Sequence, residues 1–138
     1  MILDFEELTA SQRYFQTIQT LLPRPIAWVL SENEGGGFNL APFSYFTAVC
    51  SEPPLVMFSA GKKSETEFKD TVANIKVRKH FVIHIPSRND LKAMNASSAT
   101  LPAGVSEVEQ LGLKLVEFDG FPAATAQKRE GRLRLFAI

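Results

Sequence analysis

Small and hydroxyl-bearing side chains follow one another along residues 39–51, where a buried strand would ordinarily carry Val or Leu. A strand of this composition lets a flat ligand approach its backbone, and we expect its backbone N–H groups and hydroxyls to be aimed at the polar edge of such a ligand. An edge strand of ordinary composition is the alternative, because short strands commonly carry Ser and Thr. The residues that fit the description are Ala41, Pro42, Ser44, Thr47, Ala48, Cys50 and Ser51.

A second set of candidate ligand-binding residues is hydroxylic and basic, as a bound phosphate requires. Its members are Arg24, Ser59, Lys62, Lys63, Lys69 and Thr71. The tetrapeptide at residues 64–67 has capping-box spacing, which predicts a helix start there with unpaired backbone N–H groups that attract anions. A charged helix end that only faces water explains the same residues.

The first half of the chain is predicted to form one helix and a β-hairpin that position these sets. An apolar strand at 26–31 with both faces buried precedes a Gly-rich turn, and a second strand runs over residues 39–50. Pro42 lacks the N–H of a strand ladder, so this second strand is predicted to be an edge or to be bulged there. Residues 9–22 are predicted as a helix, with Thr9 or Ser11 as its N-cap and one apolar face at Tyr14, Ile18 and Leu21.

The second half alternates helices and short strands. Helices are predicted after residue 64, over residues 90–98 with Leu91 and Met94 inward, and from Ser106 to a C-terminal Gly112. Strands are predicted over residues 55–59, 81–85, 113–118 and 132–135. Many strands with few helices predict a mainly β fold with flanking helices (α+β), in the form of a β-barrel with helices outside.

Composition and charge exclude several classes of protein. The 138 residues predict one domain, 1–138, and a net charge of zero argues against nucleic-acid binding, which needs clustered Lys and Arg. No apolar run reaches the length of a membrane span. The single Cys50 and the lack of a leader pattern favour a reducing cytoplasm.

The remaining chemically capable side chains are predicted to be structural. His80 and His84 stand four apart, but His84 lies in a strand pattern, so helical zinc-binding geometry does not apply. Cys50 has no neighbouring base and is expected to be small and buried or to face the ligand. Glu107 and Glu109 belong to a helix start. We therefore predict no metal site and no catalytic acid, base or nucleophile.

Five segments stand in order along residues 8–118: PRPIAWVLS, NLAPFSYFTAVCSEPPLVMFSAG, KDTVANI, FVIHIPS and MNASSATLPAGVSEVEQLGL. Together they resemble the flavin reductase-like family with the FMN-binding split β-barrel. The resemblance implies FMN at the interface of a homodimer, with its ring on the first strand set and its phosphate held by hydroxyl and basic side chains. Implied ring contacts are Asn39, Ala41, Pro42, Ser44, Thr47, Ala48, Cys50 and Ser51; implied phosphate or ribityl contacts are Ser59, Lys69, Thr71 and Asn74.

The function that the resemblance implies is an NAD(P)H-dependent flavin reductase, in which NADH or NADPH passes hydride to N5 of FMN. The cofactor carries this chemistry, which agrees with the absence of a predicted catalytic side chain. An FMN-binding electron carrier that never binds nicotinamide is one alternative, and a non-catalytic dimerising barrel is another. Residues 119–138 depart from the family pattern, so we expect a barrel short of its C-terminal strands, through truncation or a shifted reading frame, whose exposed edges a partner covers or which aggregates.

Overall fold

A three-stranded antiparallel sheet forms the centre of the computed structural model, which describes residues 2–102, 104–118 and 121–126. Its order is β2-β1-β5, from β1 (Ala27–Glu32), β2 (Phe38–Phe43) and β5 (Val82–His84). The first five residues of β1 are buried, which covers both of its faces and confirms the predicted central strand.

The register of this sheet puts Val29 opposite Ala41, and Trp28 between Pro42 and His84. β2 is an edge strand, as the missing N–H of Pro42 predicted. The β1–β2 connection is the predicted Gly-rich turn, in which Gly36 and Gly37 take positive φ values that favour glycine.

Apolar side chains pack on both faces of the sheet. One face carries Ala27, Val29, Phe43 and Ile83, against which Ile75 of helix α2 (Asp70–Arg78) packs. The opposite face carries a second buried cluster, which is completed by the short helices α3 (Leu91–Ala96) and α4 (Glu107–Gln110) and by β6 (Leu115–Phe118); its buried members are Trp28, Leu30, Leu40 and Val108. The site described below lies on the α2 side and at the β2 edge.

The predicted single strand over residues 39–50 is wrong, because the chain breaks at Ser44 and Tyr45 and enters a different sheet. β3 (Phe46–Ser51) pairs with β4 (Pro54–Phe58) in a separate antiparallel hairpin, with a register shift between Ala48 and Cys50. The N–H of Ser59 donates to the carbonyl of Tyr45 at 2.8 Å and closes the base of the hairpin. The break went unseen because Ser44, although serine is common in turns, was interpreted as one of the hydroxyl residues of the strand, and Tyr45 is not a turn residue.

The helix predicted to begin near Ser64 begins six residues later, at Asp70, with Lys69 as its N-cap. The Ser64 hydroxyl does accept the Glu67 N–H at 3.2 Å, as capping-box spacing predicts, but this bond closes a turn before the helix. The helix predicted over residues 90–98 is shorter, follows a 3-10 turn (Arg88–Asp90), and leaves Leu91 exposed instead of buried. Ser106 caps α4 and Gly112 follows its C-cap with positive φ, both as predicted.

The C-terminal part adds one strand that sequence analysis missed. β7 (Phe121–Ala126) pairs antiparallel with β6, which confirms the strand predicted at 113–118 with a later start. The strand predicted at residues 132–135 lies outside the described residues.

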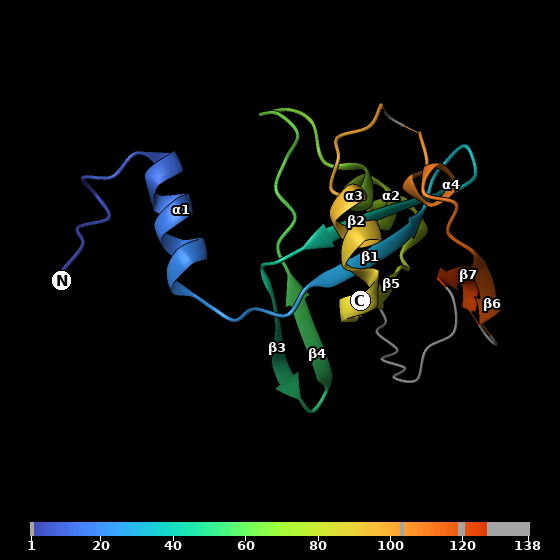
Figure 1. Cartoon of the computed structure of the whole chain (residues 1–138), viewed down its shortest axis with the longest axis horizontal. Helices are drawn as coiled ribbons and strands as arrows, with labels where there is room; N and C mark the ends of the chain where they lie inside the picture. The colour runs from blue at the N-terminus through green and yellow to red at the C-terminus, as the bar shows by residue number, and fades with distance from the viewer. Residues whose placement is uncertain (1, 103, 119–120, 127–138) are drawn as a thin grey trace.

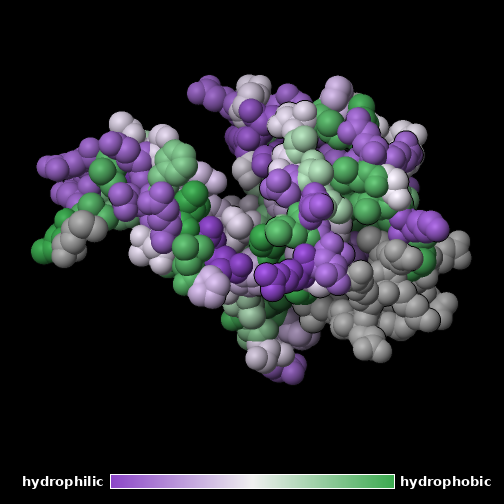
Figure 2. All heavy atoms as spheres, viewed as in Figure 1, coloured by the Kyte–Doolittle hydropathy of each residue, from purple (hydrophilic) through white to green (hydrophobic). Residues whose placement is uncertain are grey.

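Two elements project from the sheet and its helices. Figure 1 shows helix α1 (Ala10–Thr20) standing apart at one end of the molecule and the β3–β4 hairpin extending away from the sheet. Thr9 caps α1 through a complete capping box. The apolar face of α1 is exposed at Tyr14 and Leu21, and Figure 2 shows apolar side chains over the hairpin. Among the described helices, none is long and apolar enough to cross a membrane.

Candidate functional site

A buried polar cluster joins β2 to α2. Nδ2 of Asn39 donates to Oγ1 of Thr71 at 2.8 Å, and both side chains are buried. Nδ2 of Asn74, one turn along α2, donates to Oγ of Ser31 at 3.1 Å and to Oδ1 of Asn33 at 2.8 Å. The structure therefore brings together three residues that the sequence predicted separately. Because Asn39 and Thr71 face one another, their direct contact with a flavin stays a prediction.

Basic side chains surround the start of α2 but differ in what they contact. Lys69 is exposed, and its Nζ lies 5.6 Å from the centre of the Phe43 ring on β2. Lys63 donates to Oδ1 of Asp70 at 2.8 Å, and this hydrogen bond raises the pKa of the lysine. Asp70 thus neutralises Lys63. Among the ion pairs of the described residues Lys69 does not appear, so it is the cation at this helix end best placed to receive an anion.

The outer edge of β2 is covered at one end by α4. The N–H of Leu40 donates to Oε2 of Glu107 at 2.9 Å, and the Oγ of Ser106 donates to the Phe38 carbonyl at 2.6 Å. In an antiparallel strand, the backbone groups of successive residues point alternately toward and away from the partner strand. The backbone groups of Pro42, two residues after Leu40, therefore point away from β1, as those of Leu40 do. Pro42 has no N–H, and the edge beyond Phe38 therefore presents the carbonyls of Leu40 and Pro42.

This edge does not match one sequence-based expectation. We predicted backbone N–H groups aimed at the ligand, but the outward N–H of Leu40 is already bonded. Burial raises the pKa of Glu107, while the hydrogen bond from Leu40 opposes the shift. Glu107 is the first residue of a capped helix, as predicted, and it also serves the strand edge.

The predicted ring-contact residues of β3 lie on an exposed surface. Thr47, Ala48, Cys50 and Ser51 are all exposed, so of the two places expected for Cys50 the buried one is wrong, and the one that faces the ligand stays a prediction. The Cys50 thiol donates to the Glu52 carbonyl, with Sγ 3.1 Å from the oxygen. Small side chains leave the backbone of this strand open to a flat ligand or to another protein surface.

Arg24 is the sequence-predicted phosphate candidate that the structure uses differently. Its Nε donates to the Ser44 carbonyl at 3.2 Å, and its Nη1 donates to the carbonyls of Ile18 and Leu21 near the end of α1. The guanidinium also lies 5.8 Å from the centre of the Tyr45 ring. Arg24 therefore links the end of α1 to the corner between β2 and β3 by hydrogen bonds, and we do not assign it to the phosphate.

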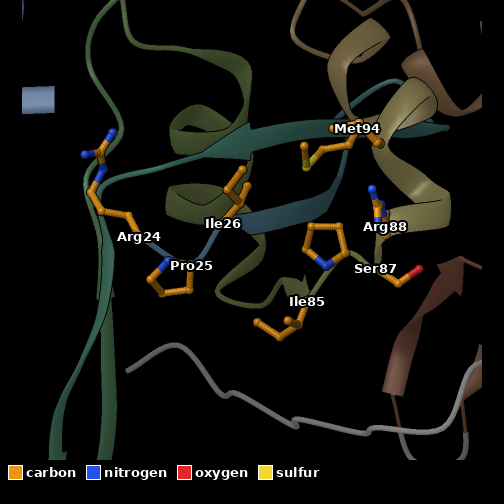
Figure 3. Close-up of a pocket in the computed structure, with 9 residues that line it drawn as sticks. Arg24, Pro25, Ile26, Ile85, Ser87, Arg88 and Met94 are labelled. Carbon is orange, nitrogen blue, oxygen red and sulfur yellow. The ribbon is translucent and has the colours of Figure 1, made fainter. Parts of the chain in front are cut away.

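An open hollow of about 330 Å³ lies beside this corner (Figure 3). It is mainly apolar, and Figure 3 shows Arg24 and Ser87 pointing away from it. A small-molecule site needs polar groups that converge on the ligand, so this hollow does not define one. The lining residues are Arg24, Pro25, Ile26, Ile85, Pro86, Ser87, Arg88, Leu91 and Met94.

The histidines are structural, as predicted. Nδ1 of His84 lies 3.1 Å from the Trp28 carbonyl on the central strand, and burial lowers the pKa of His84. Nε2 of His80 lies 3.7 Å from Oε2 of Glu32. Within the described ranges, no group of three His, Cys, Asp or Glu side chains is arranged to hold a metal ion.

Two members of the polar cluster were missed by sequence analysis. Ser31 and Asn33 follow the apolar run of β1, and both are buried. The available signal was a serine inside a strand predicted to be buried on both faces, because a buried hydroxyl needs a hydrogen-bond partner.

Residues 19–126 match a family model described as a flavin reductase like domain. An uncharacterized protein of Halalkalibacterium halodurans is 36% identical over 135 residues, covering 98% of this chain and 64% of that protein. The chain spans about half to two thirds of the length of several curated relatives that it matches.

Solved structures show the same fold. Nitrilotriacetate monooxygenase component B from Bacillus cereus matches with a TM-score of 0.86 and 32% identity, over 92% of this chain and 62% of that one. A split barrel domain protein of Shewanella frigidimarina matches with a TM-score of 0.74 and 20% identity, over 93% of this chain and 64% of that one. The predicted split-barrel, mainly β fold with flanking helices is therefore confirmed.

Proposed function

Because this chain belongs to the flavin reductase-like domain family, we propose that it binds FMN and acts as a flavin-dependent oxidoreductase with NADH or NADPH as hydride donor. The observation that best supports this proposal is the 2.8 Å hydrogen bond between Asn39 and Thr71. It joins the strand proposed to carry the flavin ring to the helix proposed to carry the phosphate. Two buried side chains that are 32 positions apart in sequence thus hold the strand and the helix side by side.

At the phosphate end, we assign the direct charged contact to Lys69. It is exposed at the start of α2, where the positive end of the helix dipole favours anions. Asn74 gives its amide hydrogens to Ser31 and Asn33 and so supports this end from within the cluster, and the direct contact predicted for Ser59, whose N–H closes the base of the β3–β4 hairpin, stays a prediction. Asn39 and Thr71 hold α2 against β2, so that the first turn of the helix keeps its place.

At the ring end, the residues fit a flat molecule with polar atoms along one edge. Ala41 and Pro42 are half-buried, so β2 presents little bulk there, and the hydroxyls of Ser44, Thr47 and Ser51 can donate or accept. The carbonyls of the β2 edge accept from N–H donors. A flavin ring offers both an N–H donor and carbonyl acceptors, so the donor set of this surface fits it.

When bound, FMN supplies a centre that accepts hydride and passes electrons on. The side chains of this chain hold, orient and shield that centre, and none is assigned as an acid or a base. Within the part of the chain that the structure describes, burial is the main cause of the pKa shifts of His84 and Glu107, and each side chain bonds to the backbone of the central sheet, at Trp28 and Leu40, away from β3.

We further propose that the protein works as a homodimer. Val49 and Met57 are exposed on the β3–β4 hairpin, and a lone two-stranded hairpin is only marginally stable in water. Residues 42–58 carry a single charged side chain, Glu52, and charge depletion is typical of the core of an interface. A second copy that covers the hairpin would also enclose the ring surface on β3.

Anaerobic titration of the FMN-loaded protein tests the function. We expect FMN fluorescence to be quenched on binding, and the visible flavin absorbance to bleach when NADH or NADPH is added without air. Bleaching by dithionite alone would point to an electron carrier without nicotinamide activity. Unchanged FMN fluorescence over the whole titration would contradict the proposal and favour a non-catalytic barrel.

A further inference from the structure

Ser31 is the centre of the polar cluster under the proposed phosphate end. Its side chain is 1% exposed, and its Oγ accepts hydrogen bonds from Asn74 at 3.1 Å and from Asn39 at 3.5 Å. These two bonds occupy both acceptor positions of the hydroxyl. One serine on β1 therefore contacts a residue of β2 and a residue of α2 at the same time.

The amide donors of the cluster are arranged so that each depends on Ser31. Asn39 gives one hydrogen to Thr71 and the other to Ser31, and Asn74 gives one hydrogen to Asn33 and the other to Ser31. Removing the Ser31 hydroxyl would leave one N–H of each amide without its partner. A buried donor without a partner is costly, so both side chains would turn to find new acceptors.

We propose that Ser31 is a positioning residue for flavin binding, which sets the orientation of Asn39 and Asn74 and with it the placement of the first turns of α2 beside β2. This inference rests on the proposed function. Ser31 acts through its two partners and does not touch the flavin. Both partners hold α2 in place, Asn39 through its bond to Thr71 and Asn74 as a residue of the helix, so the effect is expected at the phosphate end, where Lys69 lies.

The chain offers a matched control on the other face of the sheet. Ser97 is 2% exposed and its Oγ also makes two side-chain bonds, accepting from Nε1 of Trp28 at 2.9 Å and donating to the Met94 carbonyl at 2.8 Å. Replacing Ser97 by Ala removes a buried hydroxyl of the same burial, but it does so among α3 and the second apolar cluster. The Ser97→Ala variant therefore shows how much of any loss of affinity comes from reduced stability and not from the position of Ser31.

The test compares the affinities of Ser31→Ala, Ser97→Ala and the unaltered protein for FMN and for riboflavin, which lacks the phosphate. We expect Ser31→Ala to raise the Kd for FMN about tenfold, because the amides of Asn39 and Asn74 lose an acceptor, and to change the Kd for riboflavin little. Ser97→Ala is expected to change neither Kd. Thermal unfolding of each variant shows whether the two substitutions cost similar stability.

The outcomes separate the inference from the proposed function. If the unaltered protein binds no flavin, the proposed function fails. If it binds FMN but Ser31→Ala keeps the same ratio of FMN to riboflavin affinity, or Ser97→Ala lowers that ratio equally, the positioning role of Ser31 is overturned. Should Ser31→Ala not fold, Ser31→Cys keeps the volume and weakens the acceptor, and a selective loss of FMN affinity is again required.

Discussion

The backbone N–H of Leu40, on the edge strand of the sheet, donates a 2.9 Å hydrogen bond to Oε2 of Glu107, 67 residues later in the chain. The contact places a buried carboxylate beside the strand proposed to carry the flavin. It gives the outward N–H of Leu40 an acceptor but buries an ionisable group. The stability of the protein should therefore depend measurably on pH.

Burial raises the pKa of Glu107 in the folded protein above its ordinary value of 4.5. The folded state therefore binds this proton more tightly than the unfolded state. The free energy of unfolding falls as the pH rises from the ordinary pKa through the raised pKa of Glu107. Glu107→Gln keeps an acceptor for Leu40 and removes the charge, so at about pH 8 we expect it to be at least as stable as the unaltered protein. Its stability should also change less between about pH 5 and about pH 8.

Denaturant unfolding at the two pH values measures this effect, with Glu109→Gln as the control because Glu109 is exposed on the same helix. An equal loss of pH dependence in the control would contradict the assignment to Glu107. Glu107→Ala removes the acceptor as well, and we expect it to cost about 1–3 kcal/mol at either pH.

Lys69→Gln tests the phosphate contact. A charge-assisted hydrogen bond is worth about 1.5–3 kcal/mol, so the Kd for FMN should rise about tenfold or more, while the Kd for riboflavin stays unchanged. Lys76→Gln is the control, because Lys76 is exposed in the last turn of the same helix and its Nζ also lies over an aromatic ring, 3.6 Å from the centre of the Phe68 ring. Equal affinities of both variants for FMN, measured by fluorescence quenching, would remove Lys69 from the site.

Cys50 provides a reporter for the ring surface, because it is exposed on β3 and is the single cysteine of the chain. If the flavin lies on β3, a thiol reagent should label Cys50 more slowly in its presence. With free FMN at about ten times Kd, about one site in eleven is empty, so labelling should slow about tenfold. A labelling rate that does not respond to FMN would separate the flavin from this part of β3.

The proposed homodimer predicts a difference between two exposed apolar residues. Met57 on β4 is 59% exposed and Val77 on α2 is 62% exposed. Met57→Glu would bury a charge in the proposed interface and should weaken the dimer at least about tenfold, whereas Val77→Glu should leave it intact. Sedimentation velocity distinguishes monomer from dimer for each variant. A dimer that survives Met57→Glu would exclude the hairpin as the interface.

Sequence patterns predicted the parts of this fold that depend on local periodicity. The central strand β1 and the caps at Thr9 and Ser106 follow from apolar spacing and capping residues. The corner at Ser44 and the late start of α2 depend on tertiary contacts, such as the bond from Arg24 to the Ser44 carbonyl, which no local pattern encodes.

The candidate site was predicted in the same uneven way. Residue type selected Thr71, family resemblance added Asn39 and Asn74, and the structure joins all three in one cluster. Ser31 was missed because it was counted as the last residue of an apolar strand, and no partner for its hydroxyl was sought. Its importance depends on two amides that lie 8 and 43 residues away.

The outward side of β2 has a consequence for solubility. A growing β-aggregate adds strands by matching rows of alternating donors and acceptors, and an exposed edge usually supplies such a row. Here the N–H of Leu40 is held by Glu107 and Pro42 has none, so an incoming strand would meet oxygen atoms without a matching donor. We expect this edge to resist fibril growth even while it remains open to a hydrogen-bond donor.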